Sequence, residues 1–540
     1  MIALSPTIHR LTWNARGVQT SSAGTLVPPA SAVDGAAAPS RLPRQLPPWA
    51  ARLLCWLAPT VLTGFAVGYR VADPDPWRDE FATWSAATRT VDQIFALGRH
   101  IDGVTVPYYL LAHGWGVWFG DSILALRMPS VLAVTGTAAA AALLARRLWG
   151  PRAALLAGLV LAVMPVISRY GQEARGYSFA ALFATVSTLL LVYALDHSRW
   201  WTWLAYAVSV LLLGWSHQIA LLLLLGHAVA VLTVNWKRLA WWLPGVLLAV
   251  GGVVPFALIG LDQRGAQLDW LATAQASDLA DIAGNLFISG ILGGAVCTLA
   301  AISLRDPDRW AKLLFLAAAL PVFVLYAVDQ LVTPMFVGRY LFFAVPLLCV
   351  LAGRALASLR LPHALAVVVV LALIGLPYQD EMRRTHTTFD YRRAAALVQA
   401  NAQPDDAIIY APRWGWQFTD IALRYYAGND LPRDVLLRSD ELHNASLWAT
   451  ECADPGVCLT GTDRVWTLSA DNLENGRRAG ATDQLSYPEQ AALTSFEQLT
   501  TTRLEGFTMA LFVRRPPADP PPDQPTPADR RWGPGNRSAG

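Results

Sequence analysis

The feature that most constrains this chain is a series of long apolar stretches between residues 49 and 378. Most have about 17–25 residues, and a helix of about 20 residues crosses the roughly 30 Å hydrocarbon core of a bilayer. Of the 540 residues, 54% are hydrophobic and only 15% are charged, unlike a soluble enzyme of this size. The sequence therefore predicts an α-helical polytopic membrane protein. The predicted spans are 49–71, 127–146, 152–167, 177–195, 200–216, 218–234, 239–261, 284–304, 311–331, 337–353 and 362–378.

The segment 106–120 decides the orientation of these eleven spans. It is short for a span and is interrupted by Gly114 and Gly116. If it crossed the bilayer, the basic tail before the first span and the later basic connections would lie on opposite sides. If it is a re-entrant or interfacial helix in a long external loop, 72–126, they share one face, which the positive-inside rule places in the cytoplasm. The basic connections are 145–152, 196–200, 235–239, 304–312 and 353–360.

With this orientation the remaining polar clusters all face outward. They suggest one polar cavity at the outer leaflet instead of a conduction path through the bilayer. The clusters are Asp79 with Glu80, Asp102, and the stretches 168–178, 215–218, 262–283 and 333–340.

The two ends of the chain differ in composition from the spans. Residues 1–48 are rich in Pro, Ala and Ser and carry no early apolar core, which predicts a disordered cytoplasmic tail without a cleavable signal peptide. Residues 379–515 predict a small extracytoplasmic α/β domain, with an amphipathic helix followed by strands at 407–411, 464–470 and 506–515. Residues 516–540 are rich in Pro and predict disorder.

The five cysteines fall into two groups. Cys452 and Cys458 close a short loop in the predicted external domain, where either a disulfide or an idle thiol pair fits the spacing. The three cysteines in spans, Cys55, Cys297 and Cys349, are predicted to be packing residues. No Walker loop, GxGxxG motif, zinc-type spacing or nucleic-acid signature is present in the sequence.

Four motifs in order carry a resemblance to a known family. They are WRDEFATW after the first span, DGVTVPYYLLAHGW with LRMPS later in the same loop, PVISRYGQEARGYS, and FVGRYLFFAVP. Together, over about residues 50–378, they resemble membrane glycosyltransferases of the GT-C superfamily. The resemblance is to family 39, the protein O-mannosyltransferase-like and aminoarabinose-transferase-like group, in the form common in actinobacteria.

The resemblance implies an inverting transfer of a sugar from a polyprenyl phosphate to a glycan, lipid or protein acceptor outside the plasma membrane. The lipid phosphate supplies the activation, so no nucleotide is expected in the site. Some GT-C enzymes use a divalent metal and others do not, and no ligand cluster here requires one. The chain departs from the commoner His-Pro-Pro form of the second motif, with Thr105-Val106-Pro107 in its place. Mannose is the predicted sugar.

The acidic pair is the predicted catalytic centre. A carboxylate at the membrane edge can remove the proton of an acceptor hydroxyl as that hydroxyl attacks the anomeric carbon. The resemblance places this role on Asp79, with Glu80 orienting a sugar hydroxyl or tuning its neighbour. The alternative is that both residues only mark the polar end of a span.

Two further groups of this loop and the next are predicted to bind substrate. Asp102 would bind hydroxyl groups, and Tyr108 and Tyr109 would form an aromatic floor for the sugar or isoprenoid, although a solvated loop aspartate is the alternative. In the stretch 168–178, the arginines would bind the lipid phosphate, and Arg175 could instead pair with Glu173 and shape the cavity wall. The predicted residues there are Arg169, Glu173, Arg175 and Tyr177, with Gln172 as an adjacent candidate.

His217 and the pair Arg339-Tyr340 complete the predicted site. An arginine in an apolar setting is costly unless it meets an anion, and a lipid phosphate is the natural partner, with an internal ion pair as the alternative. His217 could donate to the phosphate or a sugar hydroxyl, or could simply lie at the interface.

Two rival functions come from other classes. A transporter or lipid flippase also needs many spans and a few intramembrane charges, but it predicts charges near the midplane. An enzymatically silent scaffold would use the external domain as its binding part.

Overall fold

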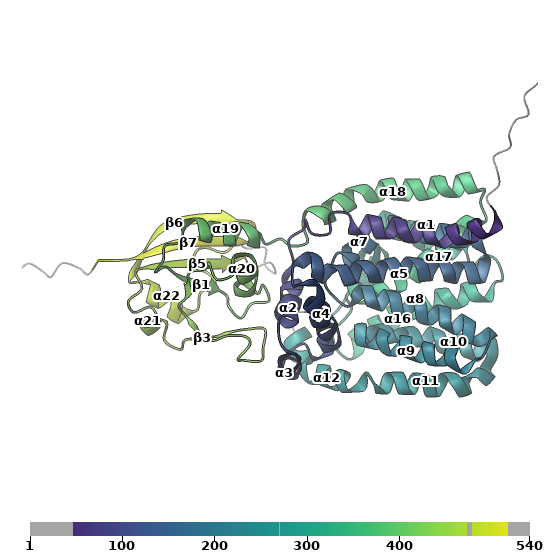
Figure 1. Cartoon of the computed structure of the whole chain (residues 1–540), viewed down its shortest axis with the longest axis horizontal. Coiled ribbons are helices and arrows are strands. Elements are labelled where there is room, and N and C mark those ends of the chain that lie inside the picture. The colour runs from purple at the N-terminus through teal and green to yellow at the C-terminus, as the bar shows by residue number, and fades with distance from the viewer. Residues whose placement is uncertain (1–46, 269–270, 472–477, 517–540) are drawn as a thin grey trace, which may run out of the picture. The chain divides into compact units, whose positions relative to one another are not determined.

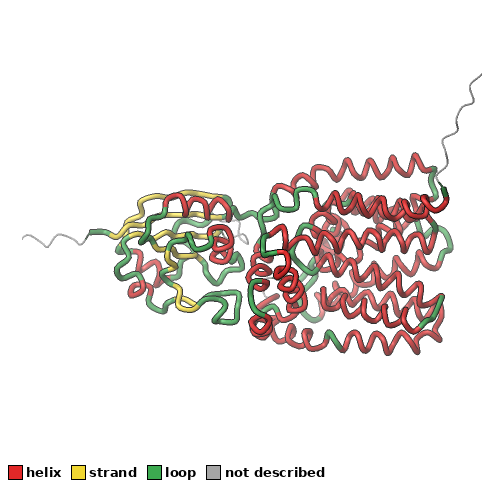
Figure 2. The backbone as a smooth tube through the Cα atoms, viewed as in Figure 1, coloured by secondary structure: helices red, strands yellow, loops and turns green. Residues whose placement is uncertain are grey.

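The computed structural model describes residues 47–268, 271–471 and 478–516. The predicted tails 1–48 and 516–540 lie outside this part of the chain, except at their inner ends. The membrane part is helical, and the residues from 407 onward hold the strands (Figure 2).

The helical part contains eighteen α-helices and four 3-10 turns among the described residues. They are α1 (Pro48–Gly68), α2 (Arg78–Ala87), α3 (Val91–His100), η1 (Gly103–Thr105), α4 (Val106–Phe119), α5 (Ile123–Trp149), α6 (Pro151–Val163), α7 (Pro165–Gly171), α8 (Tyr177–Asp196), α9 (Trp200–Ser216), η2 (Gln218–Leu222), α10 (Leu223–Asn235), η3 (Trp236–Arg238), α11 (Leu239–Gly251), α12 (Val254–Leu268), α13 (Ala276–Ala280), α14 (Ile282–Phe287), α15 (Gly290–Ile302), α16 (Arg309–Leu331), η4 (Gly338–Ala344), α17 (Val345–Ala357) and α18 (Leu361–Arg384).

Each predicted span coincides with helical structure, so the prediction of an α-helical polytopic membrane protein is confirmed. Among the described residues, six helices are long and apolar enough to cross a membrane, and a bent pair makes a seventh. The count of eleven stays a prediction. The predicted span 239–261 is divided into α11 and α12, and α18 continues through Arg384. The long helices run side by side in Figure 1.

The loop ends of these helices sort into two groups, as the charge pattern predicts. At one end, Asp79 lies beside Arg175, and the guanidinium of Arg339 lies over Trp77. At the other end, the basic connections meet acidic and aromatic partners. Arg147 pairs with Asp196, and Arg354 lies over Trp149 and pairs with Asp306 and Asp308. The structure therefore brings Asp79 together with residues of the 168–178 and 333–340 clusters at one end of the helices, and the outward direction of that end stays a prediction.

The first outer loop is built from short helices. α2, α3 and α4 lie at one end of the long helices in Figure 1. The Thr90 side chain caps α3 by accepting a hydrogen bond from the backbone N–H of Gln93. The Ser122 side chain caps α5 in the same way, through the backbone N–H of Ala125. α4 covers the segment 106–119 as a 14-residue helix, too short to span a bilayer when upright. Its position along the membrane surface remains a prediction.

Two breaks shape the second outer loop. α6 and α7 meet at an angle of 67° at Met164-Pro165, where the proline nitrogen has no hydrogen to donate. After α7, Gly176 lies against the end of α9, and a Cβ there would fall 2.4 Å from the Ser216 carbonyl oxygen. Only glycine allows this approach, which sets the direction of Arg175 and Tyr177 on either side.

The described residues of the C-terminal domain, which the charge pattern predicts to be external and which we call the external domain, contain a five-stranded mixed sheet. The predicted strands at 407–411 and 464–470 are confirmed as β1 (Ala407–Ala411) and β5 (Arg464–Ala470), and the third is β7 (Phe507–Arg514). The sheet order is β2-β1-β5-β7-β6, where β1 is parallel to β2 and β5, and β7 is antiparallel to β5 and β6. The other elements of the domain are β2 (Arg433–Asp434), β3 (Leu437–Ser439), β4 (Thr450–Glu451), β6 (Phe496–Leu504), α19 (Tyr391–Asn401), α20 (Thr419–Ala427), α21 (Pro455–Cys458) and α22 (Tyr487–Leu493).

Both faces of the sheet are covered. Along β1, Ile408 and Tyr410 belong to one apolar cluster, while Ala407 and Ile409 belong to another, as expected for side chains that alternate along a strand. The first cluster continues into the outer loop and includes Phe81. Cys452 and Cys458 form a disulfide, which decides between the two alternatives left open by the spacing.

Candidate active site

Asp79 lies in the first turn of α2, where the free N–H groups of a helix favour negative charge. One carboxylate oxygen is 3.8 Å from Arg175 Nη2 and the other is 3.7 Å from Arg78 Nε. The side chain is 17% exposed. A carboxylate in this position is held by charge but remains open to a small partner.

Arg175 connects Asp79 to Asp102. Its Nη1 donates to the Tyr109 hydroxyl over 3.4 Å, and that hydroxyl donates to Asp102 Oδ2 over 2.6 Å. The second oxygen of Asp102 accepts from Gln267 Nε2 over 3.1 Å. Burial raises the pKa of Asp102, and the charge of Arg175 opposes this shift. Asp102 is therefore neither a solvated loop aspartate nor isolated from the acidic pair.

The role predicted for Glu80 needs correction. Its side chain is fully buried, and its oxygens accept from Arg127 Nε over 2.8 Å and Nη2 over 2.6 Å. The backbone N–H groups of Ala174 and Trp77 donate to the same carboxylate over 3.0 and 3.3 Å. With both oxygens engaged, Glu80 is a structural anchor of the loops and does not face a sugar hydroxyl.

The two tyrosines of the second motif do not form one aromatic floor. Both are buried, and they point to different neighbours because adjacent residues of a helix are about 100° apart. Tyr109 bonds to Asp102, whereas the Tyr108 ring lies edge-on to Phe179 at 6.2 Å. The predicted role of Tyr108 as a sugar platform is therefore corrected to packing.

The predicted alternative, an ion pair between Arg175 and Glu173 in the second outer loop, is not the pairing that the structure shows. Glu173 lies 3.3 Å from Arg169, four residues earlier in the chain, and Arg175 pairs with Asp79 instead of Glu173. Glu173 is buried, and burial raises its pKa to about 7 against the opposing charges of Arg169 and Arg339. Gln172 is also buried and donates to the carbonyl oxygens of Val67 and Tyr69, so it is a structural residue.

Arg339 lies in an aromatic setting at the start of η4. Its guanidinium carbon is 5.7 Å from the centre of the Trp77 ring and 5.5 Å from that of Tyr340, and the guanidinium carbon of Arg169 lies 5.6 Å from the same tryptophan. Of the acidic residues in the 262–283 loop that could form an internal ion pair with it, Asp262 is exposed and Asp269 lies outside the described residues. Two guanidinium groups thus share one indole ring close to the acidic pair.

A line of rings follows from Tyr340. Its ring centre is 5.0 Å from His217, which is 5.5 Å from Tyr177, and Tyr177 is 5.4 Å from Tyr170. The predicted residues His217, Tyr177 and Tyr340 are therefore brought together. They line one side of the arginines.

Two residues of the site, Arg127 and Trp77, are not among the predicted site residues, and only Arg127 has a signal in the sequence. Arg127 lies in the LRMPS motif within a predicted span, where an arginine demands a partner. It binds Glu80 and donates to the carbonyl oxygens of Val71 and Pro74 over 2.8 and 2.9 Å. Trp77 opens the first motif, but its contact with two arginines depends on loops distant in sequence.

The arrangement can perform acid–base chemistry beside an anion. Asp79 is a carboxylate that can accept a proton, and Arg78 and Arg175 lie 3.7 and 3.8 Å from it. Arg169 and Arg339 add positive charge over the ring of the nearby Trp77. Within the described ranges, no group of three or more His, Cys, Asp or Glu side chains is placed to hold a metal ion.

Comparisons with known proteins show which families and relatives part of the chain is similar to. The model of the family described as "Dolichyl-phosphate-mannose-protein mannosyltransferase" matches residues 105–259. Over 153 residues the chain is 33% identical to the "Undecaprenyl phosphate-alpha-4-amino-4-deoxy-L-arabinose arabinosyl transferase" of Pseudomonas paraeruginosa (strain DSM 24068 / PA7). The protein of that name from Pseudomonas aeruginosa (strain UCBPP-PA14) has the same identity. The match covers 28% of this chain and spans about a quarter (25%) of the length of these relatives.

A solved structure covers much more of the chain. The crystal structure of ArnT from Cupriavidus metallidurans bound to undecaprenyl phosphate aligns with a TM-score of 0.57 at 14% identity, over 85% of this chain and 98% of that one. The chain has the GT-C fold. The apo form of the same protein aligns with a TM-score of 0.58 over 84% and 97% of the two chains. The GT-C resemblance drawn from the four motifs is thereby confirmed at the level of the fold.

Proposed function

We propose that this protein is an inverting glycosyltransferase that moves a sugar from a polyprenyl phosphate to an acceptor hydroxyl at the outer face of the plasma membrane. The observation that carries the proposal is Asp79, a partly exposed carboxylate near Arg169, Arg175 and Arg339 at one end of the spans. The relatives named for undecaprenyl-phosphate arabinosyl transfer and the GT-C fold support the same class. The acceptor is a glycan, lipid or protein of the cell envelope.

Asp79 is the proposed general base. It takes the proton of the acceptor hydroxyl while the hydroxyl oxygen forms a bond to the anomeric carbon. The bond from that carbon to the phosphate oxygen breaks on the opposite face, so the configuration inverts. Arg175 holds the carboxylate oriented. The proton stays on the Asp79 carboxyl group until the products leave and then passes to water, which restores the carboxylate.

The lipid phosphate is the proposed partner of Arg339 and Arg169. Both guanidinium groups lie over the ring of Trp77, which keeps the planar donors in place. Phosphate gains a second negative charge as it leaves, and fixed cations stabilise that charge. The isoprenoid tail remains in the bilayer.

The donor sugar is proposed to be neutral, with mannose as the first candidate. The named relatives use a 4-amino sugar, which carries a positive charge. Among the described residues of this site, Asp79, Glu80 and Glu173 each already lie beside an arginine, and the two oxygens of Asp102 already accept from Tyr109 and Gln267. An added ammonium would meet a surplus of cations, whereas a hydroxyl group would not.

The test is transfer from two synthetic donors, mannosyl and 4-amino-4-deoxyarabinosyl polyprenyl phosphate, by the full chain in membranes. We expect Asp79→Asn to lower kcat about 100- to 10,000-fold, since the amide cannot accept the proton. Arg339→Lys should instead raise KM for the donor, because lysine keeps the charge but loses the planar fork.

Asp92→Asn is the matched control, as Asp92 is an exposed aspartate of the same loop. It should transfer sugar at the native rate. Native transfer by Asp79→Asn would refute the base role. No transfer from any polyprenyl phosphate, together with movement of a lipid or solute across the bilayer, would favour the transporter class.

A further inference from the structure

The catalytic helix α2 presents two faces to two different parts of the chain. Residues two positions apart on an α-helix are separated by about 200° around the axis. Asp79 faces Arg175 of the membrane part. Phe81 is 1% exposed and enters an aromatic cluster from the external domain, with ring centres 5.0 Å from Tyr391, 5.9 Å from Tyr425 and 6.3 Å from Tyr426.

The next turn of α2 contacts the same helix of the external domain, α20. The Trp84 ring meets Tyr425 edge-on at 5.4 Å. The Tyr425 hydroxyl accepts the backbone N–H of Ile123 over 3.0 Å, at the start of α5. Tyr425 therefore links the catalytic helix, the first residue of a membrane helix and the external domain.

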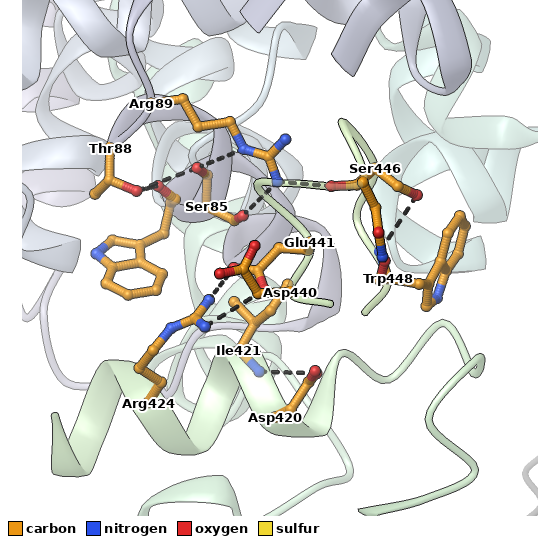
Figure 3. Close-up of polar contacts among 12 residues, drawn as sticks. Ser85, Thr88, Arg89, Asp420, Ile421, Arg424, Asp440, Glu441, Ser446 and Trp448 are labelled. Carbon is orange, nitrogen blue, oxygen red and sulfur yellow. Dashed lines mark hydrogen bonds and ion pairs between the residues drawn. The ribbon is translucent and has the colours of Figure 1, made fainter. Parts of the chain in front are cut away.

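The chain is also fixed on both sides of α2. Before it, the Asp75 carboxylate accepts from the Tyr426 hydroxyl over 3.1 Å and pairs with Arg392 at 2.7 Å. After it, buried Arg89 donates to the carbonyl oxygens of Ser85 over 3.2 Å and Ser446 over 2.7 Å (Figure 3).

An ion pair lies close in the chain to Ser446, whose carbonyl oxygen accepts from Arg89. Arg424 of α20 pairs with Glu441, which shortly precedes Ser446 in the chain, and its guanidinium lies 6.0 Å from the Trp84 ring. Figure 3 shows Arg89, Glu441 and Arg424 together, drawn from both parts of the chain. Aromatic contacts therefore act on α2 itself, while hydrogen bonds and an ion pair hold the residues on either side of it.

We infer that the external domain positions α2 for catalysis, with Phe81 as the principal positioning residue and Tyr425 and Arg89 as its supports. The domain fixes the angle at which Asp79 meets the acceptor hydroxyl. The statement about catalysis rests on the proposed function, whereas the clamp on α2 does not.

This role predicts a particular kinetic pattern. The proposed phosphate partners, Arg169 and Arg339, lie on α7 and η4. The clamp reaches them only through Trp77, the N-cap of α2, over whose ring both guanidinium groups lie. Loosening α2 should therefore lower the rate of the chemical step more than it weakens donor binding, since a displacement near 1 Å costs on the order of 100-fold in rate. If Phe81 served only for packing, its loss would lower the amount of folded protein but would not lower kcat more than it changes KM.

The experiment compares Phe81→Ala, Phe81→Leu and Tyr487→Ala in the full chain. Tyr487 is an exposed tyrosine of the external domain and serves as the control. For Phe81→Ala we expect kcat lower on the order of 100-fold, a much smaller change in KM for the donor, and faster hydrogen exchange of the amides of residues 78–87. Phe81→Leu should recover most of both properties because it refills the aromatic cluster.

The two measurements separate the outcomes. Faster exchange in Phe81→Ala, with no transfer by the native protein from any donor, would keep the clamp and reject the proposed function. Unchanged exchange or unchanged kcat would overturn the clamp. If Phe81→Ala does not accumulate in membranes, Tyr425→Phe gives a milder test, because it removes the bond to Ile123 at the start of α5 and keeps the ring contacts with Phe81 and Trp84. It should show the same changes in kcat and exchange in smaller size, and the absence of both would overturn the clamp.

Discussion

Asp79 and Glu80 are neighbours in sequence but have different surroundings. Glu80 is enclosed by Arg127 and two backbone N–H groups, while Asp79 keeps part of its surface open beside Arg175. A catalytic carboxylate needs access, and a structural carboxylate needs all its bonds made. The adjacent anchor keeps the backbone of Asp79 in place.

Glu173 gives the residue-scale prediction. Burial raises its pKa from the ordinary 4.5 to about 7, so its contribution to stability is fully present below pH 4.5 and is lost as the pH rises through 7. The loss should be on the order of 3 kcal/mol between about pH 4.5 and about pH 8. Thermal unfolding in detergent should show this decline in the native chain.

The control is Glu173→Gln, which keeps the shape of the side chain and removes the titration. Its unfolding temperature should vary less with pH across the same window. An equal decline in both proteins would assign the pH dependence to another group.

At the scale of elements, the buried pair of Glu80 and Arg127 joins three segments. Arg127 belongs to α5, Glu80 to α2, and the carbonyl oxygens of Val71 and Pro74 to the connection after α1. The N–H group of Ala174 adds the second outer loop. Loops far apart in the sequence thus share one ion pair.

Arg127→Met is the prediction at this scale. It leaves the Glu80 carboxylate buried without its cation, which should destabilise the protein by about 3–5 kcal/mol. The double variant Glu80→Leu/Arg127→Met should recover much of this loss, because an apolar pair replaces the buried charges. Thermal unfolding of the purified variants measures both changes.

Measuring the activity of the double variant distinguishes a purely stabilising role of the Glu80–Arg127 pair from a role in positioning α2. The double variant should remain poorly active even where it unfolds at a near-native temperature, because α2 has lost its anchor. Full activity of the double variant would mean that Glu80 and Arg127 do not position Asp79.

At the scale of the whole molecule, the orientation rests on charge placement. The basic connections meet at one end of the helices and the predicted site at the other. The positive-inside rule assigns the basic end to the cytoplasm. This assignment remains a prediction, and so does the count of eleven spans.

Cysteine labelling tests the orientation. With Cys55, Cys297 and Cys349 replaced by alanine, cysteines at Asp92 and Tyr487 should react with an impermeant reagent added to intact cells, and one at Lys237 should not. All three positions are exposed, so a missing signal reports the side of the membrane. Labelling of 92 and 487 on opposite sides would end the model of one external face.

The sequence by itself determined the class of the fold and the order of its parts. Apolar length predicted the spans, and short apolar runs predicted the strands at 407–411 and 464–470, because both signals are local in the chain. The four motifs likewise pointed to Asp79. β6 was missed, since its side chains are mostly exposed and give no clear apolar pattern.

Only the tertiary structure decided how the polar residues pair. Glu80 and Tyr108 had plausible substrate roles in sequence, and their burial against Arg127 and Phe179 removed those roles. The placement of Phe81 against the external domain was equally invisible. The physical reason is that a charge or ring finds its partner across loops far apart in the chain, and the partner, not the local pattern, decides whether a side chain is an anchor or a reactive group.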